Sequence, residues 1–137
     1  LPLAGADRLL GLAPGDRVAY LGFPLEDLAG GGANQQNPAA IMKSGIVSQM
    51  TDWWLRQADP SQRHLIQHDL GVAGGASGSP LFDIEGNVVG VVSAGNMAAG
   101  VDVTSGKAKR IPSGVVLNFA QRIDLLGEML IADGNGL

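Results

Sequence analysis

The most informative part of the sequence for chemistry is a short glycine-rich segment that surrounds Ser77. Residues 74–80 read Gly-Gly-Ala-Ser-Gly-Ser-Pro, and an apolar run follows directly. A hydroxyl that attacks a carbonyl needs bare backbone N–H groups beside it to hold the oxyanion that forms, and glycine lets the chain bend and expose such groups. Ser77 is therefore the candidate nucleophile, whereas an ordinary turn between two apolar runs is the plainer interpretation of the segment.

A serine hydroxyl needs a neighbouring base to remove its proton. The sequence holds two histidines, His64 and His68, and both precede the glycine-rich segment in a predicted strand. His68 and Asp69 cannot act on one point together, because adjacent residues of a strand face opposite sides. We expect both histidines to be partly exposed strand side chains, and the base to come from outside this chain.

Composition narrows the classes of partner. The 137 residues suit one domain, and the net charge of −4, with no basic cluster longer than residues 107–110, makes nucleic acid an unfavoured partner. No apolar run approaches the roughly 20 residues of a membrane span. Without cysteine there is no disulfide, and because the histidines lack a third ligand at metal-binding spacing we expect no metal and no cofactor. The abrupt start, which does not resemble a signal peptide, indicates a piece of a longer polypeptide.

The hydrophobic pattern predicts six strands and one helix. Alternating or apolar runs bounded by Gly and Pro predict strands at residues 16–24, 41–50, 64–69, 80–84, 88–94 and 111–118. Glu-Gly-Asn at 85–87 suits a hairpin turn, and residues 29–38 suit a mobile surface loop. Helical spacing over 119–131, with Asn118 as a cap and Gly134 beyond the end, predicts a helix. The fold class is therefore all-β: a six-stranded antiparallel β-barrel with a C-terminal α-helix.

The segment around Ser77 resembles the nucleophile loop of trypsin/chymotrypsin-like serine peptidases. In that family Gly-x-Ser-Gly-Gly-Pro precedes a strand, and a later Val-Ser-x-Gly edge receives the substrate; the matching residues here are Gly75, Ser77, Gly78, Pro80, Val92, Ser93 and Gly95. Residues 44–48, Ser-Gly-Ile-Val-Ser, resemble the high-temperature-requirement (Deg-type) branch. The resemblance implies that residues 1–137 are the C-terminal half of a peptidase domain, the second barrel plus a terminal helix. The first barrel, which carries the catalytic His and Asp in that family, is absent from the chain.

The same resemblance assigns roles to residues around Ser77. The N–H groups of Gly75 and Ser77 would form the oxyanion hole. The floor of the specificity pocket would be Gly71, with walls from Val72, Ser93, Ala94, Gly95 and Gly114. None of these residues is charged, and because an unpaired buried charge is costly, small or medium apolar residues should be preferred before the cut. Gly95 would pair with the extended substrate backbone.

Two residues depart from the family pattern. Ala76 stands where digestive enzymes carry the Asp that captures a new N-terminus after zymogen cleavage, so that mode of activation is not expected. Ser79 replaces the second glycine after the nucleophile.

Two functions follow as hypotheses. The first is a serine endopeptidase half-domain that hydrolyses peptide bonds through an acyl-enzyme once the missing first barrel supplies His and Asp; the chain alone should be inactive. The alternative is a non-catalytic peptide- or protein-binding module.

Polypeptide substrate and the first barrel are the expected partners, and the face left bare by that barrel should promote homo-oligomers. Trp53 and Trp54 either pack on the barrel or contact a partner. The compartment is open, although the resemblance favours an extracytoplasmic one.

Overall fold

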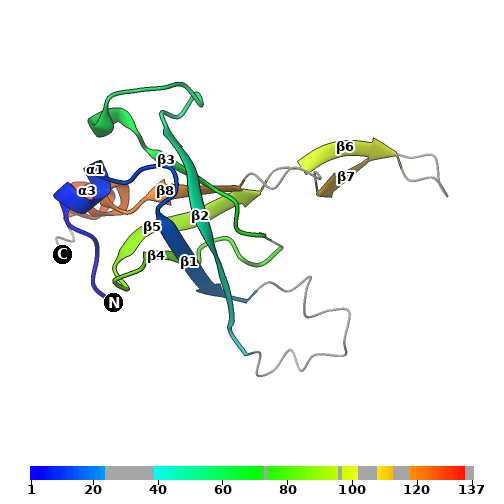
Figure 1. Ribbon diagram of the computed structural model, residues 1–137, viewed down its shortest axis with the longest axis horizontal. Coiled ribbons are helices and arrows are strands. Elements are labelled where there is room, and N and C mark those ends of the chain that lie inside the picture. The colour runs from blue at the N-terminus through cyan, green and yellow to red at the C-terminus, as the bar shows by residue number, and fades with distance from the viewer. Residues whose placement is uncertain (24–38, 73, 96, 102–107, 113–117, 135–137) are drawn as a thin grey trace.

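Six of the eight strands in the described part of the chain close into one antiparallel barrel (Figure 1). This computed structural model describes residues 1–23, 39–72, 74–95, 97–101, 108–112 and 118–134. The elements are α1 Ala6–Leu10, β1 Arg17–Gly22, β2 Ile41–Thr51, the 3-10 helix η1 Pro60–Gln62, β3 Leu65–His68, β4 Pro80–Asp83, β5 Val88–Gly95, β6 Met97–Val101, β7 Ala108–Pro112, β8 Asn118–Arg122 and α3 Asp124–Ala132. Neighbours around the barrel follow the order β1, β2, β3, β8, β5, β4. The predicted all-β barrel with a C-terminal helix is confirmed, and within the described residues three strands precede Ser77, as expected.

Alternation along the strands produces the barrel core. In β1 the buried residues Val18 and Tyr20 alternate with more exposed neighbours, as the period of two requires. Gly90 of β5 lies where strands approach closely: a Cβ atom there would be 2.7 Å from the Gln121 carbonyl oxygen and 2.9 Å from Ile66 Cδ1. A side chain at position 90 would therefore force strands apart. The interior is lined from every barrel strand by buried apolar residues, among them Val18, Tyr20, Val47, Met50, Ile66, Leu81, Val89, Val92 and Ala120.

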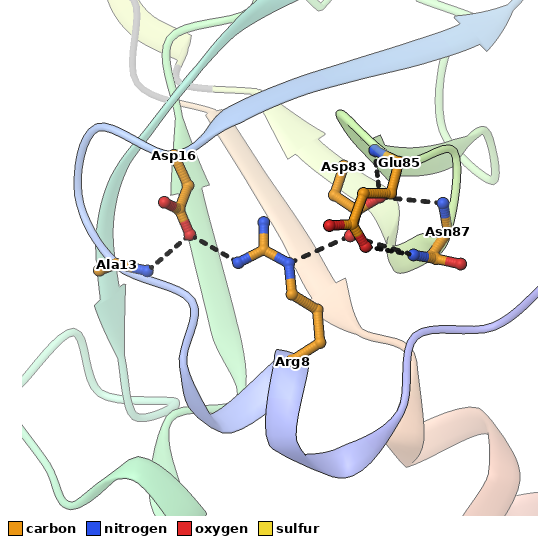
Figure 2. Close-up of polar contacts among 6 residues, drawn as sticks. All are labelled: Arg8, Ala13, Asp16, Asp83, Glu85 and Asn87. Atoms are coloured by element: carbon orange, nitrogen blue, oxygen red, sulfur yellow. Dashed lines mark hydrogen bonds and ion pairs between the residues drawn. The ribbon is translucent and has the colours of Figure 1, made fainter.

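An ion-pair bridge attaches the N-terminal helix to the barrel (Figure 2). Arg8 of α1 donates from Nη1 to Asp16 Oδ2 (3.0 Å) and from Nε to Asp83 Oδ2 (3.1 Å). The buried Asp83 carboxylate also accepts from the backbone N–H groups of Glu85 and Asn87 at 3.0 and 2.9 Å. Burial by itself raises the pKa of Asp83, but the hydrogen bonds from Asn87, Arg8 and Glu85 outweigh it and hold the pKa below its ordinary value. One carboxylate thus fixes both α1 and the turn after β4.

The hairpin predicted at residues 85–87 is confirmed. β4 and β5 pair antiparallel, and Gly86 in the connecting turn has φ +83°, a conformation that glycine adopts without strain. Because β4 begins three residues after Ser77, this hairpin fixes the C-terminal side of the glycine-rich segment.

The C-terminal third differs from the sequence prediction. Residues 118–122 form β8, which completes the barrel between β3 and β5, although the pattern predicted a helix from Phe119. The helix begins at Asp124 instead, and Asn118, predicted as its cap, lies in the strand. The apolar residues of the short segment 118–122 fit the spacing of a helix as well as that of a strand. Pairing with β3 and β5 on either side favours the extended form. Of the predicted strand at 111–118, residues 111 and 112 lie in β7 and residue 118 begins β8. The rest of it, residues 113–117, and the loop predicted at 29–38 lie outside the described residues.

Candidate active site

Ser77 is exposed at the tip of a tight turn between β3 and β4. The Ser79 N–H donates to the Ala76 carbonyl oxygen at 3.1 Å, which closes a β-turn around Ser77 and Gly78. Gly78 has φ +87° at the third position of this turn, where glycine is favoured. Ala76 is fully buried and Ser79 is nearly so, whereas Ser77 is open to solvent. The residues on either side of Ser77 therefore anchor the turn while its own side chain stays accessible.

The turn is fixed directly on β5. The Gly78 N–H donates to the Val92 carbonyl oxygen (2.8 Å), and the Val92 N–H donates to the Ser79 carbonyl oxygen (2.9 Å). Gly75, the other predicted member of the oxyanion hole, is exposed and has φ +94°, which an L side chain rarely adopts. The structure thus fixes the turn that holds Ser77 on Val92 of β5, the residue before Ser93.

A β-bulge shapes the predicted substrate edge of β5. The pairing register with β8 shifts between Val92 and Ala94, which leaves Ser93 as the extra residue. The Ser93 hydroxyl donates to the Phe119 carbonyl oxygen of β8 at 3.3 Å. Bulges bend a strand and redirect side chains, and they recur beside active sites. On its β4 side, β5 is paired from Val88 to Val91, so the edge at residues 93–95 lies beyond that ladder.

The predicted pocket floor is held by two side chains that sequence reasoning did not select. The buried Tyr20 of β1 donates its hydroxyl to the Gly71 carbonyl oxygen at 2.9 Å. Asn118 of β8 donates its amide to the Leu70 carbonyl oxygen. Val72 is half-buried and packs against the core. The chain after β3 is therefore tied to opposite sides of the barrel, whereas Gly114, the other predicted wall residue, lies outside the described residues.

The prediction for His68 was wrong. Its side chain is fully buried in β3, between Val47 of β2 and Asn118 of β8, and neither ring nitrogen has a hydrogen-bond partner in the described structure. Asp69 is exposed and accepts from the Ile46 N–H at 2.7 Å, so the two residues do face opposite sides. His64 is half-buried, as expected. A buried His68 cannot serve as the base for an exposed Ser77.

Burial of His68 predicts an acid-sensitive fold. Burial lowers the pKa of His68 from 6.5 to about 4, against the opposing effect of the Asp69 charge. Between these two pH values the unfolded chain binds more protons than the folded one, so the free energy of unfolding falls as pH falls through this window. The loss should reach about 2 kcal/mol at pH 5 and about 3 kcal/mol near pH 4. Urea unfolding at pH 7 and pH 5 measures it.

Two variants test whether His68 causes this pH dependence of the free energy of unfolding. Replacing the buried ring by an apolar side chain of similar size, His68→Leu, should flatten the dependence between pH 7 and pH 5, whatever it does to stability at pH 7. The matched control His64→Gln should retain the full loss. An unchanged slope in His68→Leu would assign the acid sensitivity to other groups.

The loop after β2 displays its tryptophans instead of burying them. Asp52 Oδ1 accepts from the N–H groups of Trp54 and Arg56, both at 2.8 Å, and Leu55 has φ +61° within this turn. Trp53 stacks on His64 with ring centroids 5.4 Å apart, yet 45% of it is exposed, and Trp54 is 75% exposed. Trp53 therefore packs in part, while Trp54 is available to a partner.

A hollow of about 480 Å³ on the outer face of β1 and β2 was not foreseen. Exposed apolar side chains of Met42, Ile46 and Ile84 contribute to its lining, and none of residues 71–79 does. It is separate from the Ser77 turn.

In the described residues, no cluster of three or more His, Asp or Glu side chains could hold a metal ion, and no helix there is long and apolar enough to cross a membrane.

Comparison with known proteins identifies the family of this chain. The profile of the trypsin-like peptidase domain matches residues 1–91, and the chain belongs to this family. Among solved structures, the fold is similar to that of the HtrA-type protease AlgW with a decapeptide: 21% identity, TM-score 0.58, covering 99% of this chain and 34% of that one. A serine-to-alanine variant of AlgW with a decapeptide gives 22% identity and the same TM-score and coverage. The chain thus spans about a third of the length of these structures. No curated protein matches it.

Proposed function

We propose that residues 1–137 form the C-terminal half of a serine endopeptidase domain, with Ser77 as the nucleophile. The observation that supports this most is the exposed Ser77 in a turn whose neighbours, Ala76 and Ser79, are buried and hydrogen-bonded to β5 or to each other. A side chain held on a rigid turn loses little conformational entropy when it reaches a substrate, which is the main benefit of fixed geometry in catalysis. Family membership supports the same reaction class.

The proposed reaction uses residues of two barrels. A histidine of the first barrel removes the proton from Ser77 Oγ as that oxygen attacks the scissile carbonyl carbon. The N–H groups of Gly75 and Ser77 hold the resulting oxyanion, a contribution of about a hundred- to a thousandfold in rate for each such donor. The C–N bond then breaks, the amine leaves with the proton returned by the histidine, and water hydrolyses the acyl-serine ester.

The uncharged pocket residues predict the substrate preference. Gly71 and Val72 form the proposed floor and near wall, and Ser93, Ala94 and Gly95 complete it on β5. Cleavage of a peptide library by the complete protein should occur after Val, Ala, Leu, Ile or Met, because a charged residue would enter without a partner. Sequencing of the products measures this preference. Predominant cleavage after Arg or Lys would show that the floor is not at Gly71.

A peptide-binding module without catalysis is the second candidate. The observation that favours it is the burial of His68, which keeps this histidine from activating the exposed Ser77. Treating the complete protein with a fluorophosphonate probe separates the two candidates. Labelling at Ser77 together with peptide cleavage supports the endopeptidase. An unlabelled protein that still binds peptides supports the module.

A further inference from the structure

The segment between β2 and β3, residues 52–64, carries an exposed apolar tip. This segment projects from the barrel at the top of the view in Figure 1. Trp53, Trp54 and Leu55 are consecutive there, and their exposed fractions are 45%, 75% and 54%. Asp52 Oδ1 fixes the tip by accepting from the N–H groups of Trp54 and Arg56. Both tryptophans of the chain therefore lie in one exposed, hydrogen-bonded turn.

A hollow of about 360 Å³ adjoins this tip, and Leu55 lines it. Among the described residues no carboxylate lines this hollow. Its polar side chains all belong to residue types that can donate hydrogen bonds: Gln49, Thr51, Gln57 and Arg63. The tip and the hollow thus form one continuous feature, apolar on one side and polar on the other.

The polar side chains of the hollow have donors to spare. Arg63 donates from Nε to the Ala58 carbonyl oxygen at 2.8 Å, which orients the guanidinium, and its Nη groups donate to no described residue. The buried Thr51 hydroxyl accepts from Gln67 Nε2 at 3.0 Å, so its own proton is left to be donated. The amide oxygen of Gln49 accepts from the next backbone N–H, which leaves its NH2 group. Such a set of donors suits an oxygen-rich anion, and a guanidinium fork matches a phosphate.

The charges around the tip leave Arg63 as the cation of the hollow. Arg56 pairs with Asp52 of the same turn, with Nε 3.1 Å from Oδ2. Asp59 is exposed before η1 and does not line the hollow. Since the chain as a whole has a net charge of −4, long-range attraction does not favour an anion. A phosphate here would therefore be held by direct hydrogen bonds.

From these observations we infer that residues 52–64 form a peripheral membrane-binding site: the tip enters the headgroup region of a bilayer, and the hollow at Arg63 takes the phosphate of one phospholipid. Tryptophan favours this interface because its ring is apolar while its N–H stays hydrated. A bilayer surface needs no complementary shape and so accepts a projecting tip, whereas a protein partner would need a matching pocket. A phospholipid also supplies both chemistries in one molecule, a phosphate next to acyl chains.

This site is separate from the proposed catalytic turn. The segment leads into β3 and the Ser77 turn follows that strand, and none of residues 71–79 lines the hollow. Variants of the segment should therefore change membrane binding and leave the cleavage of a small soluble peptide at the wild-type level. Membrane binding without any cleavage would support this site and count against the endopeptidase, whereas cleavage without membrane binding would do the reverse.

Flotation of the complete protein with vesicles of phosphatidylcholine and phosphatidylglycerol tests the site. Wild type should float with the vesicles. Trp54→Ala should weaken binding about tenfold, because full burial of a side chain this large is worth about ten- to a hundredfold. Arg63→Gln should also weaken it about tenfold through the lost charge-assisted hydrogen bonds. Thermal unfolding checks the fold of each variant. Gln57→Leu, which removes a donor that no described residue uses, should weaken binding as well.

Two matched variants control for exposed apolar area and for charge. Ile84 is 75% exposed, as Trp54 is, but lies at the outer hollow, and Arg17 is an exposed cation of β1. Ile84→Ala and Arg17→Gln should therefore bind vesicles as wild type does. A wild-type protein that does not float, or equal losses in Trp54→Ala and Ile84→Ala, would overturn the site.

Vesicles without phosphate separate the two parts of the site. Wild type should bind uncharged digalactosyldiacylglycerol vesicles about tenfold more weakly, and Arg63→Gln should cause no further loss on them. A full tenfold loss in Arg63→Gln on this lipid would overturn the phosphate contact. Inorganic phosphate that raises the Tm of the wild type but not of Arg63→Gln, with no flotation, would indicate a site for free anions and overturn membrane binding.

Fluorescence quenching locates the inserted residues. Vesicles with bromine atoms on the acyl chains should quench tryptophan emission of the complete protein, because bromine quenches only the rings that reach it. The quenching should be absent in Trp53→Phe/Trp54→Phe. Quenching that persists unchanged in this double variant would place the membrane contact outside residues 52–64 and overturn the inference.

Discussion

Replacing Ser77 by alanine is expected to lower peptide cleavage by the complete protein about a millionfold, because removing the nucleophile of a serine protease eliminates nearly all of its turnover. Ser77 is exposed, so the free energy of unfolding should change by less than about 0.5 kcal/mol. Cleavage of a fluorogenic peptide and labelling by a fluorophosphonate measure the first effect, and urea unfolding measures the second.

The control for this experiment is another exposed serine on the same barrel. Ser44 lies on β2 and lines the outer hollow, and Ser44→Ala should leave both cleavage and labelling at the wild-type level. Cleavage retained by Ser77→Ala would remove Ser77 from the mechanism. Loss of cleavage in both variants would indicate that the assay reports the state of the barrel and not its nucleophile.

The parts of the fold set by local sequence were predictable. The turn at Gly86 and the alternation of Val18 and Tyr20 each depend on a few neighbouring residues, and the structure has both where the sequence placed them. The turn around Ser77 was predictable for the same reason: Gly78 supplies the positive φ that the turn requires.

Features that depend on distant partners were not predictable. Residues 118–122 carry a pattern compatible with helix or strand, and pairing with β3 and β5 decided it. His68 is a polar residue in a short strand, and its burial depends on the two strands that flank it, β2 and β8, which come from other parts of the sequence. The supports of the proposed pocket, Tyr20 and Asn118, are 51 and 48 residues from the carbonyl groups they bind. Nothing in the local sequence around Gly71 indicates either of them.

A close contact between β1 and the Ser77 turn predicts the second large effect. Gly22 ends β1, and a Cβ atom at this position would overlap the Ser79 hydroxyl and lie 3.1 Å from Ser79 Cβ. Ser79 is buried and is two residues from Ser77. Gly22→Ala should therefore displace the turn. The Ser79 hydroxyl must change rotamer and Ser79 Cβ must move by a few tenths of an ångström. Because a displacement of 1 Å at a reacting group costs about a hundredfold, we expect this smaller shift to lower peptide cleavage by the complete protein about tenfold, and overpacking to lower stability by about 1 to 3 kcal/mol.

The structure also provides a rescue for this variant. Ser79→Gly removes both atoms that the new methyl group would meet, and the remaining contact, Tyr20 Cδ2 at 3.5 Å, is an ordinary one. The double variant Gly22→Ala/Ser79→Gly should therefore recover most of the cleavage lost in Gly22→Ala, and the two changes should be strongly non-additive in a double-mutant cycle. As a control, Gly5→Ala introduces a methyl group with no atom within 4 Å and should leave cleavage unchanged. Additive effects of Gly22→Ala and Ser79→Gly would mean that β1 does not position the nucleophile through Ser79.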